Sequence, residues 1–329
     1  MSYIRNIAPG VIRYTCGRYS RDDLSNCTHT VARDLEANGM SIDSLKDSIL
    51  VLDFLAEGHD PVIIAPLVEY LTTLVGIDNI RVLFNAVVDT SNLSYRARSF
   101  VTHFANQDGK FINPGNQSTV KLEQKFLCLS RRPSLGRAQF VSQLVSTVPD
   151  IRASFGSGFP EWSQEFQQYF PNHTLPILID GDARQYVHNQ ASDIFRTCLF
   201  NVIIETSNQT DNNSWNSIFI TEKTFKCFDL YQIPIWFAVP DTVAQIRRLG
   251  FDLFDDIIDH SYDQVNDPVH RKDLVIDQIK KLNDCYTLLD CQQIRSELWN
   301  RLQSNYIQLD QLIQKYEETH NQLIAELTA

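Results

Sequence analysis

The sequence has no long apolar run, and its first residues do not resemble a secretion signal. No stretch of its 329 residues approaches the ~20 consecutive apolar residues of a membrane span. Residues 1–5 contain no basic segment that leads into an apolar one, so we expect no signal peptide. The seven cysteines are odd in number and include no Cys-x-x-Cys pair. We therefore expect reduced, buried thiols in a cytoplasmic protein with no membrane partner.

Positive charge is also scarce. The chain has 29 Lys and Arg against 40 Asp and Glu, a net charge of -11. Nucleic-acid affinity comes largely from Lys and Arg that contact phosphates, so this balance disfavours a nucleic-acid binder, although a local basic cleft stays compatible with it. The dinucleotide fingerprint GxGxxG, the Walker A motif, HExxH and GxSxG are all missing, and the histidines show no metal-ligand spacing.

The patterns that are present indicate an α/β protein with two domains. The chain is longer than one typical domain of ~100–200 residues. Residues 48–53 and 81–89 are predicted strands, and residues 63–74 are a predicted helix between them, which is the order of a parallel βαβ unit. Residues 1–45 are mixed and polar, with helix-like stretches. The polar residues 106–118 are the best linker, so we place a boundary near residue 120.

The second half repeats the alternation of strands and helices and ends in helices from residue 273. This predicts a second Rossmann-like domain over 121–291 after a first over 1–120, with a C-terminal helix over 292–329. The predicted elements of the second domain are strands at 126–129, 175–180, 199–205 and 233–239, and helices at 134–148, 221–231 and 241–249.

Two predicted strands in the second half end in charged side chains. Strand 126–129 leads into a cluster formed by Arg131, Arg132 and Arg137, and strand 199–205 ends at Glu205. Ligands of open α/β sheets bind beyond the carboxyl ends of strands, and arginine suits bidentate contact with phosphate. Each signal alone is also explained by a solvated charge or a turn.

A predicted helix begins at Thr221-Glu222-Lys223. Thr221 is a good N-cap, and the free N–H groups and positive dipole end of a helix N-terminus can hold a diphosphate. Lys223 adds a point charge there, and Glu222 could accept hydrogen bonds from ribose hydroxyls. The alternatives are surface solvation for Lys223 and simple dipole matching for Glu222.

In this order the segments resemble a known family. Glu205-Thr206-Ser207, followed by Phe219 to Phe225, is similar to the donor-binding domain of the fucosyltransferase-like (α1,3-fucosyltransferase-type) GT-B glycosyltransferases. The strand 233–240 resembles their Val-Pro-Ile-X-X-Gly-Ala-Pro segment, and 249–263 resembles viral and environmental bacterial members. The resemblance covers roughly residues 120–270. Phe237 stands where the family has glycine, and Thr206 where it has asparagine, which bears on the donor sugar.

This resemblance implies a GT-B fold, with two Rossmann-like domains facing across a cleft and a C-terminal helix that returns to the first domain. It implies inverting transfer of a sugar from a nucleotide-diphosphate sugar, GDP-fucose-like or another GDP- or UDP-sugar, to an acceptor hydroxyl, with no metal or other cofactor. The implied donor-binding residues are Arg131, Arg132, Arg137, Asn213, Phe219, Thr221, Glu222 and Lys223, with Glu205 as a carboxylate that faces the donor sugar.

The general base of such an enzyme lies in the first domain. Candidates near predicted strand ends there are Asp53, Glu57, His59, Asp60 and Asp89, of which Asp53 and Asp89 end strands. Each is also explained as a cap, a turn residue or a solvated carboxylate, and the sequence does not choose among them.

Three alternatives stay open. Asp180-Gly181-Asp182 follows a predicted strand and could hold Mn²⁺ or Mg²⁺, as in metal-dependent glycosyltransferases. The chain could also be a non-catalytic binding or assembly module on the same fold. The acceptor could be a glycan, a protein or a modified nucleobase.

Overall fold

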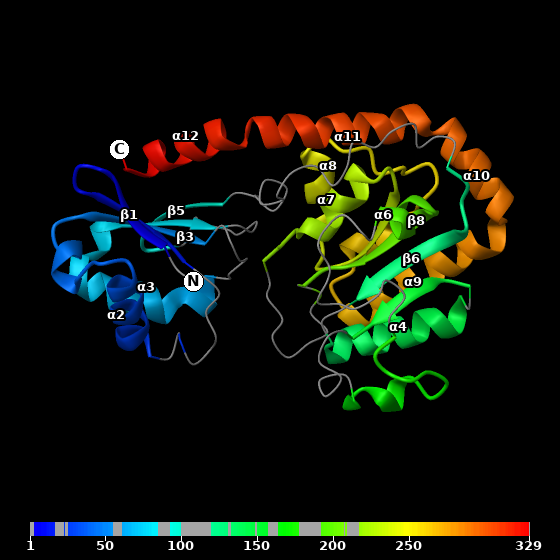
Figure 1. The fold of residues 1–329 in the computed structure, drawn as a ribbon, viewed down its shortest axis with the longest axis horizontal. Coiled ribbons are helices and arrows are strands. Elements are labelled where there is room, and N and C mark those ends of the chain that lie inside the picture. Colours follow the sequence, from blue (N-terminus) through cyan, green and yellow to red (C-terminus); the bar gives the residue numbers. More distant parts are fainter. Residues whose placement is uncertain are drawn as a thin grey trace. The chain divides into compact units, whose positions relative to one another are not determined.

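The chain folds into two compact units, drawn in Figure 1. The first comprises Met1–Asn106, Ser217–Ile220 and Leu312–Ala329, and the second comprises Gln107–Asn216 and Thr221–Gln311. The end of the chain therefore belongs to the first unit. This computed structural model describes residues 3–16, 23, 26–54, 61–84, 93–99, 120–130, 133–148, 150–156, 164–177, 192–206, 208 and 217–328.

The sheet of the first unit advances in one direction. Its strand order is β1-β2-β3-β4-β5, with β1 antiparallel to β2 and every other pair parallel. Crossovers between parallel strands are right-handed, so a sheet that grows in one direction places its crossover helices on one face. The strands are β1 (Tyr3–Ala8), β2 (Val11–Thr15), β3 (Ile49–Phe54), β4 (Ile80–Phe84) and β5 (Arg96–Ser99).

The two crossover helices, α2 (Cys27–Ala37) and α3 (Pro61–Val75), contact each other and share one core with alternate residues of the strands. The opposite face of the sheet is covered by α12 (Tyr316–Thr328), as Figure 1 shows. There Leu83 of β4 packs against Leu323 and Ile324. The last helix therefore buries a face that the local crossovers leave open.

The hairpin of β1 and β2 is a correction to the sequence analysis, which predicted mixed polar, helix-like structure over residues 1–45. The strands are short, and β2 alternates buried and half-buried residues, so it carries no apolar run. Its buried Tyr14 donates a hydrogen bond from Oη to Asp34 Oδ2 in α2, at 2.8 Å. The side chain of Asp34 thus pairs the hydroxyl of a buried residue in β2, a strand whose own sequence is weakly apolar.

The sheet of the second unit reverses its direction. All four strands are parallel in the order β7-β6-β8-β9, so the chain passes from β6 to β7 on one side and returns to β8 on the other side of β6. The strands are β6 (Gln124–Ser130), β7 (Arg152–Phe155), β8 (Cys198–Ile204) and β9 (Ile233–Phe237). The helices are α4 (Leu135–Thr147), α6 (Ser192–Arg196), α7 (Glu222–Asp229), α8 (Thr242–Arg248), α9 (Pro268–Cys285), α10 (Leu288–Glu297) and α11 (Trp299–Gln314).

Strand β7 is a second correction, because the sequence analysis predicted no strand at 152–155. It placed one at 175–180 instead. Within the described part of that segment, Ile177 makes only an isolated bridge to Phe155 of β7, and residues 178–180 lie outside the described residues.

A bidentate ion pair fixes α11 to the second unit. Arg301 donates from Nε to Asp252 Oδ2 at 2.5 Å and from Nη1 to Asp256 Oδ2 at 2.8 Å. Asn305 adds a reciprocal pair of hydrogen bonds with the backbone of Asp252, and the Arg301 guanidinium lies 4.8 Å from the ring centre of Phe254.

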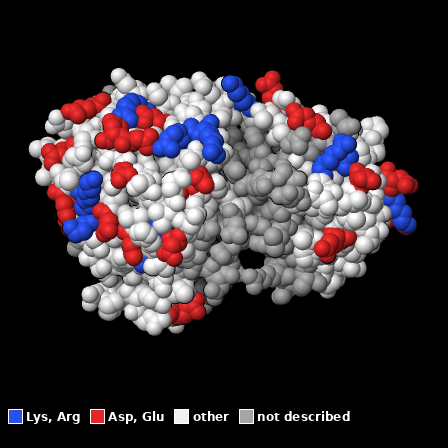
Figure 2. All heavy atoms as spheres, turned by 180° about the vertical axis from the view of Figure 1, so that it is seen from behind, with Lys and Arg blue, Asp and Glu red and all other residues white. Residues whose placement is uncertain are grey.

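The protein is of the α/β class, with two Rossmann-like units built on parallel strands and a helical C-terminus. All seven cysteines are free; six are buried and Cys285 is exposed. Across the described ranges, no helix combines the length and the hydropathy needed to cross a membrane. The face drawn in Figure 2 mixes cationic and anionic side chains over its described surface, without an extended basic patch there.

Candidate functional site

The candidate site lies at the carboxyl edge of the second unit's sheet. Ligands of open α/β sheets bind beyond the carboxyl ends of the strands, at the point where the strand order reverses. In this sheet that point lies between β6, which ends at Ser130, and β8, which ends at Ile204. Glu205 follows directly, and hydrogen bonds join it to Thr221 at the start of α7. Two of the three segments predicted from the sequence therefore meet here.

Glu205 is fully buried, and its carboxylate is used inside the protein. Oε1 accepts hydrogen bonds from the backbone N of Thr221 at 3.1 Å and from Thr224 Oγ1 at 2.8 Å. Oε2 accepts one from Thr221 Oγ1 at 2.5 Å. The carboxylate thus receives a backbone N–H and two hydroxyls, and it fixes the first turn of α7 to the end of β8. The contact with a donor sugar that the resemblance implies for Glu205 stays a prediction.

The start of α7 presents Lys223 next to the helix N-terminus. Thr221 is the N-cap, and its hydroxyl oxygen accepts from the backbone N of Lys223 at 3.4 Å and from Lys223 Nζ at 3.0 Å. Lys223 Nζ lies 3.5 Å from Glu222 Oε1. The side chain of Lys223 is 31% exposed, so the ammonium group reaches solvent while one of its donors is held by Thr221. A cation therefore lies at the positive end of a helix dipole, which suits an anionic ligand.

A set of buried hydrogen bonds, here called the frame, supports these residues. Trp236 of β9 donates from Nε1 to Thr224 Oγ1 at 2.9 Å, and Asn208 donates from Nδ2 to the carbonyl of Glu205 at 3.2 Å. Arg271 of α9 is 1% exposed and donates to the carbonyls of Asn208 at 3.1 Å and Ala238 at 2.7 Å. Neutral carbonyl groups stabilise the charge of Arg271, and its planar guanidinium links the segments that follow β8 and β9.

Unpaired hydroxyls lie at the ends of β6 and β7. The Oγ atoms of Ser130, Ser134 and Ser154 are buried and have no hydrogen-bond partner among the described residues. Ser134 is the N-cap of α4, yet its side chain makes no capping bond. Buried polar atoms are normally paired. These three buried hydroxyls therefore have no partner within the described part of the chain.

The arginine cluster is described only in part. Arg131 and Arg132 lie outside the described residues. Arg137, in the first turn of α4, is 5% exposed. Burial raises the pKa of the Cys128 thiol to about 12, and the charge of Arg137 opposes this shift. Arg137 therefore lies near the sheet interior, so its predicted contact with phosphate stays a prediction.

In the first unit, Asp53 is fully buried in a charged cluster. Arg13 donates from Nε to Asp53 Oδ2 at 2.6 Å and from Nη2 to His320 Nε2 at 3.1 Å. His320 Nε2 lies 3.7 Å from Asp53 Oδ2. To act as a base, Asp53 would have to leave this ion pair. Asp89, Glu57, His59 and Asp60 lie outside the described residues.

The remaining predicted residues are distributed as follows. Phe219 is 4% exposed and lies in Ser217–Ile220, the short segment grouped with the first unit. Asn213, Asp180 and Asp182 lie outside the described residues. Within the described residues, no group of three or more His, Cys, Asp or Glu side chains could hold a metal ion.

The sequence analysis missed Arg271 and the frame that it holds. Arginine in a polar helix is typical of a solvent-exposed face, and its carbonyl partners lie 33 and 63 residues away in the chain. Its position in the sequence carries no signal for these contacts.

Comparison with known proteins finds little. No protein-family model matches the chain, and no curated protein matches it. Among solved structures, it is similar to an alpha,alpha-trehalose-phosphate synthase (UDP-forming) from Burkholderia vietnamiensis, with 12% identity and a TM-score of 0.44 over 95% of this chain and 79% of that one. A likeness of this size assigns the chain to no family.

Proposed function

We propose that this protein is a GT-B glycosyltransferase that binds a nucleotide-diphosphate sugar at the carboxyl edge of the second unit's sheet. One observation carries the proposal. The N-terminus of α7, with Lys223, is fixed by Glu205 to the end of β8, beside the reversal of strand order. This arrangement places a cation and a helix N-terminus where α/β sheets bind their ligands.

In this proposal Lys223 and the positive dipole end of α7 neutralise the donor diphosphate. Arg131 and Arg132, which follow β6 in the chain, would add further positive charge. Glu222, whose side chain is 45% exposed, accepts from the hydroxyls of the ribose or the sugar. Glu205 positions Thr221 and Lys223 and does not contact the donor.

The reaction is a single displacement with inversion. The oxygen of an acceptor hydroxyl forms a bond to the anomeric carbon, while the bond from that carbon to the diphosphate oxygen breaks. The diphosphate leaves with the bonding electron pair, and the hydroxyl proton passes to a base of the first unit. Positive groups near the diphosphate stabilise the charge that develops on it, which is the role that a metal ion has in other transferases.

The donor proposed is a GDP- or UDP-sugar, and no cofactor is required. The resemblance of Thr221-Glu222-Lys223 and its surroundings to the fucosyltransferase-like family favours a GDP-fucose-like donor, while Phe237 and Thr206 depart from that family. The acceptor is a glycan, a protein or a modified nucleobase, and the base is one of the carboxylates or the histidine near the strand ends of the first unit.

Release of the nucleotide tests this proposal. GDP-fucose, GDP-mannose, UDP-glucose and UDP-N-acetylglucosamine are incubated with the protein in EDTA or in Mn²⁺, and free GDP or UDP is quantified. Lys223→Ala should lower release by about 100-fold, because a group aimed at developing charge is worth this much in other enzymes. Lys280→Ala, an exposed lysine of α9 paired with Asp284, is the matched control and should leave release unchanged.

Equal release by Lys223→Ala and the unmodified protein would contradict the proposal. Release only in Mn²⁺ would favour the metal site at Asp180 and Asp182.

A second candidate function is a non-catalytic module that binds a nucleotide sugar. It is favoured by the burial of Asp53, since the described base candidate is already ion-paired with Arg13. This module would bind donor through Lys223 but release no nucleotide from it, even with acceptors supplied.

A further inference from the structure

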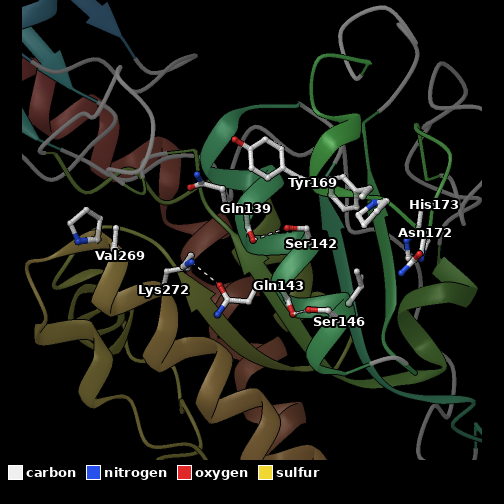
Figure 3. Close-up of a pocket in the computed structure, with 13 residues that line it drawn as sticks. Gln139, Ser142, Gln143, Ser146, Tyr169, Asn172, His173, Val269 and Lys272 are labelled. Carbon is white, nitrogen blue, oxygen red and sulfur yellow. Dashed lines mark hydrogen bonds between the residues drawn. The ribbon is translucent and has the colours of Figure 1, made fainter.

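The second unit contains a pocket of about 750 Å³, formed by elements other than the start of α7 (Figure 3). Small-molecule pockets are typically ~300–1,000 Å³, so this one can hold a ligand of several rings. Its walls come from one face of α4, from the segment after a 3₁₀ turn at Gln167–Tyr169, and from the start of α9.

The pocket wall formed by residues 169–173 is held in place from within. Gln167 donates from Nε2 to the carbonyls of Phe170 at 2.9 Å and His173 at 2.6 Å, and its Oε1 accepts from the backbone N of Leu175 at 3.2 Å. Phe170 is 1% exposed and stacks on Phe155 of β7, with ring centres 4.9 Å apart. The wall therefore has a fixed shape onto which a ligand can bind.

The one lysine of the pocket lining is already paired. Lys272 donates from Nζ to Gln143 Oε1 at 2.6 Å, the contact dashed in Figure 3, and lies 3.3 Å from Asp273 Oδ1. Gln143 Nε2 donates to the same carboxylate at 3.2 Å. The described lining includes no carboxylate, and its one lysine is matched by Asp273. An anionic ligand would find no unpaired lysine or arginine among these residues.

The neutral polar groups of the lining are not matched. The Gln139 amide, the Tyr169 hydroxyl and the Asn172 amide make no hydrogen bond to any other residue in the described structure. Amides and hydroxyls offer donors together with acceptors, as do the hydroxyls of a sugar. The Tyr169 ring and the exposed Val269 supply apolar surface for the C–H faces of sugar rings.

From this lining we infer that the pocket binds a neutral carbohydrate chain. The inference goes beyond the proposed function, because it depends on the pocket and not on Lys223. It assigns a second carbohydrate site to the unit that carries the proposed donor site.

Binding of neutral trisaccharides tests the inference. Maltotriose, cellotriose, chitotriose and mannotriose are titrated into the full-length protein and followed by saturation-transfer NMR and calorimetry. At least one should bind, and Tyr169→Ala and Gln139→Ala should each weaken it by about fivefold to tenfold. Gln168→Ala changes the exposed neighbour of Tyr169 outside the pocket and should have no effect.

Lys223→Ala separates this inference from the proposed function. It should lower nucleotide release by about 100-fold and leave trisaccharide binding unchanged. Circular dichroism checks that each variant is folded, and Asn172→Ala, on an exposed segment, repeats the test at a site that tolerates change. The inference is overturned if no trisaccharide binds, if all three pocket variants bind normally, or if inorganic phosphate competes for the site.

Discussion

Each unit buries a carboxylate at the end of a parallel strand, but the two carboxylates have different partners. Asp53 is the last residue but one of β3 in the first unit and is paired with the charged Arg13, next to His320. Glu205 follows β8 in the second unit and receives only a backbone N–H and two threonine hydroxyls. The same local pattern, an apolar strand with an acid at its carboxyl end, thus forms a buried ion pair in one unit and fixes the start of α7 in the other.

The two sheets explain this difference. In the first unit the described strand order advances in one direction, so one face of the sheet is left for α12. Asp53 Oδ2 lies 3.7 Å from Nε2 of His320, a residue of that helix. In the second unit the order reverses beside β8. The residue after that strand therefore lies where ligands bind in such sheets, and it holds the helix that presents Lys223.

The largest effect is expected from Asp53→Asn. Removing the carboxylate leaves the Arg13 charge largely buried without its partner, which costs about 3 kcal/mol of unfolding free energy. Urea unfolding measures this loss, and donor affinity should stay unchanged. Asp43→Asn, in the exposed pair with Lys46, is the control and should not alter unfolding. If Asp53→Asn instead abolishes transfer while the unfolding curve stays the same, Asp53 is the general base.

Glu205→Gln should have a smaller effect on stability and a larger one on binding. The amide NH₂ faces hydroxyl and N–H donors, so at least one buried bond is lost, at about 1–3 kcal/mol. Because the start of α7 is then less fixed, donor affinity should fall about tenfold in calorimetry. Glu123→Gln, at an exposed carboxylate of the same unit, is the control. A loss of affinity with unchanged stability would show that Glu205 faces the donor directly.

The smallest effect is expected at the Arg301 pair, which stabilises the second unit without a role at the site. Hydrogen bonds from Arg301 lower the pKa of Asp252 and of Asp256. Both carboxylates are partly exposed, so Arg301→Ala should cost only about 1 kcal/mol at pH 7. A lowered pKa stabilises the fold above the ordinary value of ~3.9 and loses this contribution as the pH falls through the lowered value.

Urea unfolding at pH 7 and pH 3 tests this sign. The difference between Arg301→Ala and the unmodified protein should shrink at pH 3, while Arg301→Lys, which keeps the charge, should behave as an intermediate. A difference that is the same at both pH values would assign it to packing of Arg301 over Phe254 instead.

Much of the fold could be predicted from local patterns. The apolar runs at 48–53, 126–129 and 199–205 are strands, because burial on both faces of a parallel sheet requires continuous apolar residues. The helix after Thr221 follows from its N-cap. The hairpin of β1 and β2 and the short strand β7 could not be predicted in this way, because they carry no apolar run of useful length.

The position of the site could be predicted from the sequence, but the roles of its residues could not. The pattern at 205 and 221–223 placed a carboxylate and a lysine near one sheet edge, which the structure brings together through Thr221. Whether a carboxylate faces solvent or is fully used inside the fold depends on partners such as Thr224, whose hydroxyl also binds Trp236 of another strand. Strand order and contacts of this kind are set by tertiary structure, and so is the frame around Arg271.

The most direct test of the central claim is calorimetric titration of a GDP- or UDP-sugar in EDTA with the unmodified protein, Lys223→Ala and Lys280→Ala. The account predicts metal-independent binding that Lys223→Ala weakens by at least about tenfold and Lys280→Ala leaves unchanged. Equal affinity for all three proteins, or no binding without a divalent metal, would contradict a donor site built on Lys223 at the carboxyl edge of the second sheet.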